Sequence, residues 1–250
     1  MTGDGDRRAG WVAGLLLAAA LVLLYTYNFP YFYGIHSANE LPRIYQAMAM
    51  VDRGALNIDP EMHRFQGTPD TAGYKGKLYP NKAPGMSLLT VPVYWIQKKA
   101  NGGETPELIR MFFWFRLFGS ILPSLLFLLL LWRFLGRLVD HPGTRRLLLC
   151  GYALGSMALT YGTLLIAHQL SGLLMATAYI LLFMHAQTDD GGDEDSEGGQ
   201  GARRGWVLPL LAGLSAGAGV LVDYQVAFIG PPLFIYALWT ARRRWRAGLW

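Results

Sequence analysis

The chain has little charge and almost no cysteine. Only 16% of its 250 residues are charged, whereas 52% are hydrophobic. A soluble domain accommodates such a composition only if its apolar residues recur at helical or strand periods, but here they are bunched into continuous runs. The single cysteine, Cys150, lies within one of these runs. A lone cysteine excludes a disulfide within these residues, and its apolar setting favours an inert packing role.

The apolar runs predict membrane-spanning helices. Residues 11–27 and 117–132 are apolar on nearly every face, which is typical of a segment in lipid. We predict an all-α integral membrane protein with about six transmembrane helices, each of roughly 17 to 25 residues. The predicted spans cover residues 10–28, 112–133, 147–165, 167–186, 206–222 and 224–241.

The first span has no small-residue cleavage pattern after its apolar core. The chain continues as YNFPYFYG, which is bulky and aromatic, so a retained anchor is favoured over a cleaved signal peptide. The net charge of +5 does not indicate nucleic acid, because the basic residues gather at the ends of apolar runs. Arginines cluster between the second and third spans, before the fifth and after the sixth. We therefore predict a cytoplasmic amino terminus and cytoplasmic Arg-rich loops.

Two connections between the predicted spans are long. Residues 187–205 contain the acidic, Gly-rich stretch TDDGGDEDSEGGQGA and are predicted to form a disordered cytoplasmic loop. Residues 30–104 are predicted to form a long first extracytoplasmic loop. Within it, residues 85–97 are apolar but too short to span, and Lys98 and Lys99 follow them. This pattern predicts a helix that lies in the membrane interface.

The topology places polar residues from distant parts of the sequence at one level, the outer rim of the bundle. They are Glu40, Arg43 and Lys82 in the outer loop, Arg116 in the second span, His168 before the fourth span and Asp223 before the sixth. Five of them have an ordinary structural alternative: Asp223 can cap a helix, His168 can bond a carbonyl, Lys82 and Arg116 can reach lipid headgroups, and Glu40 can be a solvated loop acid. Ionisable groups near membrane depth are costly, so their shared level favours a functional site.

Two stretches of the outer loop carry a resemblance to a known family. NELPRIYQAMAMVDRG, followed by YPNKAPGMSLL, resembles the first outer loop of GT-C membrane glycosyltransferases. It is more specifically similar to the bacterial group that contains the protein O-mannosyltransferases and the lipid A aminoarabinose transferases. The resemblance covers residues 11–239. Because members of the group are usually longer, with more spans, we expect this chain to be the amino-terminal half of such a protein.

The resemblance implies a membrane glycosyltransferase in the bacterial inner (plasma) membrane. Such an enzyme moves a sugar from a polyprenyl-phosphate donor to a hydroxyl acceptor on the extracytoplasmic face, with inversion. The expected partners are the polyprenyl-phosphate sugar, membrane lipid and an acceptor that is a glycan, a lipid or a protein, and no nucleic acid is expected.

The resemblance also implies roles for individual residues. Glu40 matches the catalytic carboxylate that takes the proton of the acceptor hydroxyl, and Arg43 matches the arginine that accompanies it. Lys82 matches the motif lysine and, with Arg116, is expected to bind the donor phosphate. The other expected substrate-binding residues are Asp70, Tyr79, Asn81, His168, Asp223 and Tyr224, and Asp70 is the next candidate base. Some relatives carry a metal-linked acid where this chain has Asn81, so no metal and no cofactor are expected.

Three alternatives stay open: a non-catalytic transporter or flippase-like protein that binds lipid phosphates, a purely structural membrane subunit, and an inactive truncated fragment. A transporter is disfavoured because the sequence shows no internal repeat and its polar residues lie at the rim rather than at mid-depth. A structural subunit would leave the loop around Lys82 unexplained.

Overall fold

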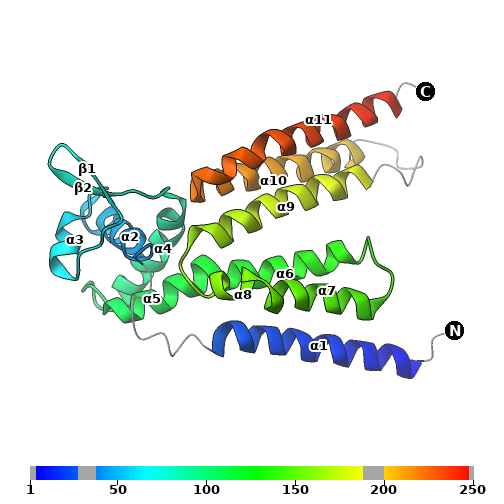
Figure 1. Ribbon diagram of the computed structural model, residues 1–250, viewed down its shortest axis with the longest axis horizontal. Coiled ribbons are helices and arrows are strands. Elements are labelled where there is room, and N and C mark those ends of the chain that lie inside the picture. The colour runs from blue at the N-terminus through cyan, green and yellow to red at the C-terminus, as the bar shows by residue number, and fades with distance from the viewer. Residues whose placement is uncertain (1–3, 28–37, 188–199, 248–250) are drawn as a thin grey trace.

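The computed structural model describes residues 4–27, 38–187 and 200–247, and the side chains of residues 10–27, 38–187 and 206–241. Figure 1 shows long helices that run side by side, with shorter helices and a small hairpin gathered at one end. We call residues 38–107, which form these shorter elements, the polar head. The predictions for residues 28, 30–37 and 188–199 lie outside the described residues.

Three segments of the described chain are long and apolar enough to cross a membrane: Gly10–Tyr27, Leu108–Leu135 and Ala167–Gln187. They correspond to the first, second and fourth predicted spans. The first lies in α1 (Asp4–Tyr27) and the third is α9 (Ala167–Gln187); the second joins α5 (Leu108–Arg116), a π-helical turn η2 (Leu117–Ile121) and α6 (Leu122–Leu135). The mostly helical fold is thereby confirmed, whereas the count of about six spans stays a prediction.

The predicted third span is interrupted. Residues 147–165 belong to two helices, α7 (Pro142–Gly155) and α8 (Met157–Gly162), followed by a short loop. Ser156 between them is extended, with φ −126° and ψ −178°, and its hydroxyl accepts the Ala158 N–H at 3.1 Å. Ser156 therefore ends one helix and caps the next. A hydropathy pattern does not reveal this break, because the flanking residues remain apolar on both sides.

The helices of the last two predicted spans do not begin at the predicted residues 206 and 224. The helix α10 (Gln200–Val222) ends where the predicted fifth span ends, but its apolar part, Trp206–Val222, is shorter than the three long segments. Residues 224–229 form a 3₁₀ turn, η3 (Tyr224–Ile229), and only then does α11 (Gly230–Ala247) begin. Two prolines follow Gly230. Proline lacks an amide hydrogen and is tolerated in the first turn of a helix, which explains the later start.

The polar head contains three helices and one hairpin. The helices are α2 (Leu41–Arg53), α3 (Asp59–Arg64) and α4 (Gly85–Ala100), and the antiparallel strands are β1 (Thr71–Tyr74) and β2 (Lys77–Pro80). The hairpin turns through Lys75 and Gly76, whose φ angles of 49° and 73° are positive, as two-residue hairpin turns require. The hairpin was not predicted from the sequence. The helix expected over residues 85–97 is present as α4, while its position in the membrane interface stays a prediction.

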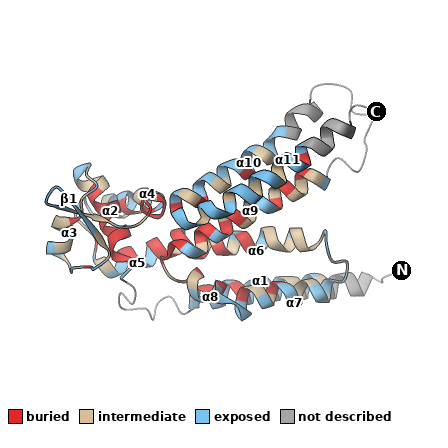
Figure 2. Ribbon diagram, turned by 45° about the horizontal axis from the view of Figure 1, so that its top comes forward, coloured by how far each residue is buried: buried red, intermediate tan, exposed pale blue. Residues whose placement is uncertain are grey.

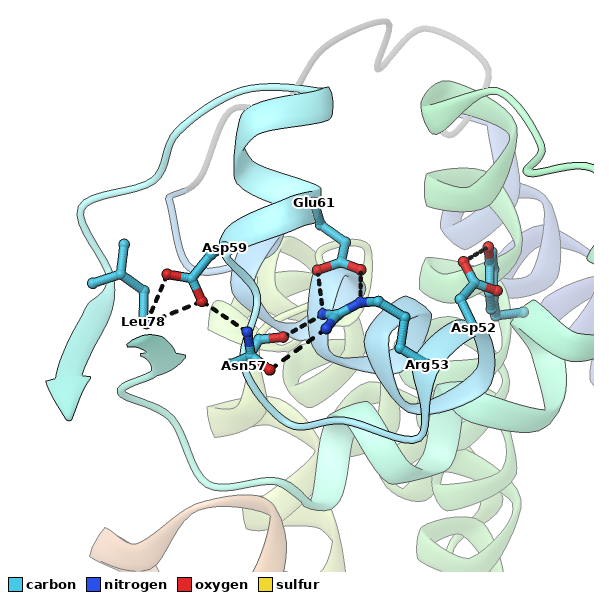
Figure 3. Close-up of polar contacts among 7 residues, drawn as sticks. Asp52, Arg53, Asn57, Asp59, Glu61 and Leu78 are labelled. Atoms are coloured by element: carbon cyan, nitrogen blue, oxygen red, sulfur yellow. Dashed lines mark hydrogen bonds and ion pairs between the residues drawn. The ribbon is translucent and has the colours of Figure 1, made fainter. Parts of the chain in front are cut away.

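A network of side chains ties the hairpin to the helices of the head (Figure 3). Arg53 donates to the two carboxylate oxygens of Glu61 at 3.2 and 2.9 Å and to the backbone oxygen of Asn57 at 2.6 Å. Both oxygens of Asp59 accept the Leu78 N–H, at 3.0 and 3.1 Å. The end of α2, the helix α3 and the strand β2 are therefore connected through polar contacts.

One hydrophobic core joins the head to the bundle. Its buried members come from α2, α4, α5, the start of α9, the end of α10 and the loops between helices, and include Ile44, Tyr45, Met86, Tyr94, Phe115, Leu165, Leu170 and Val222. Figure 2 shows buried residues gathered in the head and where the helices meet it, whereas much of α10 and α11 is exposed. Large apolar side chains are exposed along α1 as well, among them Trp11 and Leu15. Such surfaces are expected of helices that face lipid.

Candidate functional site

The start of α4 packs directly on the backbone at the end of α10. A Cβ atom built on Gly85 would lie 2.6 Å from backbone atoms of Leu221 and 2.7 Å from the Val222 nitrogen. Glycine is therefore required for this approach. It brings the turn that carries Lys82 to the same end of the molecule as Asp223.

An enclosed ion pair lies at the junction of head and bundle. Both carboxylate oxygens of Glu40 accept hydrogen bonds from Arg116, each at 2.8 Å, and Oε1 also accepts the Leu165 N–H at 2.8 Å. Glu40 is 0% and Arg116 1% exposed. The Arg116 guanidinium also lies 5.2 Å from the ring centroid of Phe112. This cluster joins the head, the second apolar segment and the loop before α9.

The π-helical turn η2 holds the same loop. The Ser120 hydroxyl donates to the Leu164 backbone oxygen at 2.6 Å. A Cβ atom on Gly119 would lie 2.7 Å from Leu165 Cδ1, so a larger residue there would require the buried Leu165 side chain to shift. Extra π-helical residues are frequent at functional sites. Here the π turn fixes the loop from which α9, and with it His168, begins.

Arg43 is a buried cation beside this cluster. It is 3% exposed, and its Nη1 donates to the Asn39 backbone oxygen. Its Nε atom is buried and has no hydrogen-bond partner among the described residues. Burial lowers the pKa of Arg43 from its ordinary value, and the charges of Asp223, Asp70 and Glu40 act in the opposite direction. Arg43 is thus electrostatically coupled to three carboxylates from three parts of the sequence.

Two further ion pairs each contain at least one side chain that reaches solvent. Lys82 Nζ lies 3.3 Å from Asp70 Oδ2, with side chains 24% and 23% exposed. His168 Nδ1 lies 2.6 Å from Asp223 Oδ2, with side chains 57% and 11% exposed. The other oxygen of Asp223 accepts the Gln225 N–H at 3.1 Å, which fixes the carboxylate. The Nε2 atom of His168 is the ring nitrogen that this pair leaves for other contacts.

Searches against protein-family models, curated proteins and solved structures find no match to this chain. The likeness to GT-C glycosyltransferases therefore stays an expectation, and the site is interpreted from its geometry. Within the part of the chain that the structure describes, no group of three or more His, Cys, Asp or Glu side chains is placed to bind a metal ion.

Glu40 and Arg116 are enclosed and bonded to each other in this structure. A general base must come within about 2.6–3.2 Å of the proton donor, whereas both oxygens of the buried Glu40 are bonded to Arg116. Arg116 is equally enclosed, so a phosphate would have to displace a buried carboxylate to reach it. In this geometry the pair connects head and bundle, and the expected roles of Glu40 as base and Arg116 as phosphate ligand stay predictions.

The remaining expected residues lie near the hairpin and at the start of η3. Tyr79 lies on β2 opposite Ala72, and Tyr224 is 62% exposed. Asn81 donates its N–H to the Asp70 backbone oxygen at 3.3 Å. Among the described residues, Asn81 is the only one of these three that forms a hydrogen bond to a member of the Lys82–Asp70 or His168–Asp223 pair.

Sequence reasoning missed several residues that build the site. They are Asn39, Gly85, Gly119, Ser120 and Leu165. Asn39 and Leu165 act through backbone atoms, which no side-chain pattern identifies. The available signal was the position of Gly85 directly after a proline and before an apolar run, which indicates a close backbone approach.

Proposed function

We propose that the chain is a membrane glycosyltransferase that moves a sugar from a polyprenyl-phosphate donor to a hydroxyl acceptor at the extracytoplasmic face. The observation that supports this is the position of two ion pairs, Lys82–Asp70 and His168–Asp223, at the end of the bundle where the start of α4 packs on the end of α10. The pairs lie where apolar helices meet a polar head, which is the level of a lipid-linked phosphate in a membrane.

The proposal includes a topology. The chain has about six spans in a bacterial inner membrane, its amino terminus lies in the cytoplasm, and the polar head lies outside. The Arg-rich loops support this orientation, because arginine and lysine are enriched on the cytoplasmic side. The helix α4 then lies along the outer interface.

The donor phosphate binds to Lys82. This amine lies at an accessible position, and its partner Asp70 can release it without uncovering a buried charge, since both side chains are partly exposed. As the bond between the sugar and the phosphate breaks, negative charge grows on the leaving phosphate. A fixed cation stabilises this developing charge more than it stabilises the bound donor. The buried charge of Arg43 adds a second positive contribution from beneath.

His168 replaces Glu40 as the proposed proton acceptor. Asp223 accepts the Nδ1–H of His168, so the neutral ring presents Nε2 as its acceptor. The acceptor hydroxyl oxygen attacks the anomeric carbon and passes its proton to Nε2, while the phosphate leaves with the electron pair of the broken bond. Asp223 stabilises the imidazolium that forms. One displacement of this kind inverts the anomeric centre.

The test uses the purified chain in lipid nanodiscs with a panel of labelled polyprenyl-phosphate sugars. Donor binding and transfer of label to acceptors are measured separately. We expect at least one donor to bind and to transfer its label. His168→Gln should lower transfer about 100- to 10,000-fold with donor binding retained, which is the usual contribution of a general base.

The matched control is His63→Gln, which alters an exposed histidine of the head and should leave transfer unchanged. Donor binding without any transfer would indicate a lipid-phosphate-binding protein rather than an enzyme. Failure of every donor to bind, or equal transfer by His168→Gln and the unaltered chain, would overturn the proposal.

A further inference from the structure

A second candidate site runs along the bundle and ends far from the polar head. It is an apolar groove of about 810 Å³ between α1, α6 and α7. Its walls include Leu15 and Ala18 of α1, Leu125 and Leu129 of α6, and Leu149 of α7. Its volume falls within the ~300–1,000 Å³ typical of ligand sites.

The groove exists because α1 is hydrogen-bonded to α7 near both of its ends. Near the head, the Tyr25 hydroxyl donates to the Ala153 backbone oxygen at 3.1 Å. At the other end, Arg146 Nη2 donates to the Gly10 backbone oxygen at 3.0 Å. The groove-lining residues of α1, from Gly10 to Val22, lie mainly between these two attachments.

Two arginines close the far end of the groove. The Arg145 guanidinium lies 4.9 Å from the ring centroid of Trp132 and packs against Gly136, where a Cβ would approach its Nη1 to 2.7 Å. The Nε atoms of Arg145 and Arg146 are both buried and lack a hydrogen-bond partner among the described residues. No carboxylate among the described side chains forms an ion pair with either arginine. Two partly buried positive charges therefore meet an apolar groove that holds no anion among the described side chains.

We propose that this groove binds an anionic glycerophospholipid from the leaflet at this end of the molecule. The lipid phosphate accepts hydrogen bonds from Arg145 and Arg146, and an acyl chain fills the space between α1, α6 and α7. Arginine suits this ligand, because its planar fork presents several donors to a phosphate. An apolar wall that ends in two cations matches a lipid, whereas a free phosphate would leave the groove empty. Nothing in this inference depends on the proposed sugar transfer.

The experiment measures lipid binding to the delipidated chain in detergent by native mass spectrometry. The probes are dioleoylphosphatidylglycerol, dioleoylphosphatidylcholine and inorganic phosphate. We expect the phosphatidylglycerol to bind more tightly than the phosphatidylcholine. Replacing both cations, Arg145→Gln with Arg146→Gln, should weaken phosphatidylglycerol binding about ten- to thirtyfold, given the usual contribution of each basic residue facing an anionic lipid. The matched control, Arg133→Gln with Arg137→Gln, removes two charges near the same end and should change binding less than threefold, roughly.

A second variant tests the apolar part of the groove without touching the arginines. Ala18→Trp places a large side chain in the groove and should block phosphatidylglycerol by sterics while leaving both cations in place. Equal binding of the two lipids, or equal loss in the two arginine variants, would overturn the proposal. Full displacement of the lipid by inorganic phosphate would also overturn it. The same holds if Ala18→Trp leaves phosphatidylglycerol binding unchanged, because either result would indicate a phosphate site without a lipid chain.

Discussion

The two kinds of ion pair at the junction of head and bundle differ in their access to solvent. The Glu40–Arg116 pair is enclosed, with side chains 0% and 2% exposed, whereas Lys82, Asp70 and His168 are all more than 20% exposed. From the sequence, all of these residues are predicted to lie at one level, the outer rim of the bundle. The structure separates a pair that connects elements from pairs that can exchange a partner for a ligand.

The difference follows from the free energy of desolvation. A charge taken out of water is tolerated only where a well-placed partner and further hydrogen bonds compensate it. Glu40 meets this condition through three hydrogen bonds, two from Arg116 and one from Leu165. Removing one of these partners is costly, so the pair is suited to holding a fixed geometry. The Lys82–Asp70 pair loses little when it separates, because both of its side chains are partly exposed, and in the His168–Asp223 pair the histidine is the exposed partner; these pairs are therefore better suited to binding.

The largest expected effect is on stability, from Glu40→Gln. The amide keeps the shape but removes the charge that both Arg116 hydrogen bonds reach, and breaking a buried ion pair typically costs about 3–5 kcal/mol. Equilibrium unfolding in detergent, followed by circular dichroism, measures the loss. Adding Arg116→Met should recover a large part of it, because the buried cation is then gone.

The same variant discriminates between the two roles considered for Glu40. If Glu40→Gln unfolds like the unaltered chain but has lost sugar transfer, Glu40 acts in the chemistry, as the resemblance implies. If stability falls while the transfer per folded molecule is retained, the connecting role holds.

The next largest effect is expected for Asp223→Asn. The amide still accepts the Gln225 N–H and so retains the cap of η3, but it no longer stabilises a protonated His168. We expect transfer to fall about 100-fold or more. Stability should change by less than about 1 kcal/mol, because the cap is kept. A large loss of stability with unchanged transfer per folded molecule would mean that Asp223 only caps the turn.

Hydropathy and topology rules identified the long apolar segments, and the structure pairs His168 with Asp223, two residues that the sequence places at one level. These rules could not predict which charged residues form ion pairs with each other. Glu40 and Arg116 are 76 positions apart, and the apolar pattern around each is the same whether the residue faces its partner or a ligand. The break at Ser156 was missed for a related reason, because a cap depends on local hydrogen bonds rather than on composition.

A smaller effect is expected for Lys82→Ala. A charged hydrogen bond to phosphate is typically worth about 1.5–3 kcal/mol, so donor affinity should fall about ten- to hundredfold. Lys82→Arg should restore part of this affinity, since the charge is kept but the shape is not. Lys77→Ala, which alters an exposed lysine at the start of β2, is the control and should change little. Equal losses for the two alanine variants would indicate a diffuse basic surface rather than a defined phosphate site.

The smallest effect is expected for Lys98→Ala, which tests whether exposure alone explains the behaviour of Lys82. Lys98 Nζ lies 2.7 Å from Asp52 Oδ1, with side chains 29% and 19% exposed, so the pair matches Lys82–Asp70 in access to solvent. It lies at the end of α4 away from the junction, and Asp52 also accepts a hydrogen bond from the Tyr94 hydroxyl at 2.8 Å. Burial, together with this bond and the charge of Asp52, raises the pKa of Tyr94, so Asp52 keeps a neutral donor after the lysine is removed.

An exposed pair of this kind contributes about 0.2–1 kcal/mol to stability. Lys98→Ala should therefore cost no more than this in unfolding experiments and should leave donor affinity and transfer unchanged. Donor binding that falls as far in Lys98→Ala as in Lys82→Ala would mean that any half-exposed lysine of the head attracts the donor. The distinction between the junction and the rest of the head would then have to be abandoned.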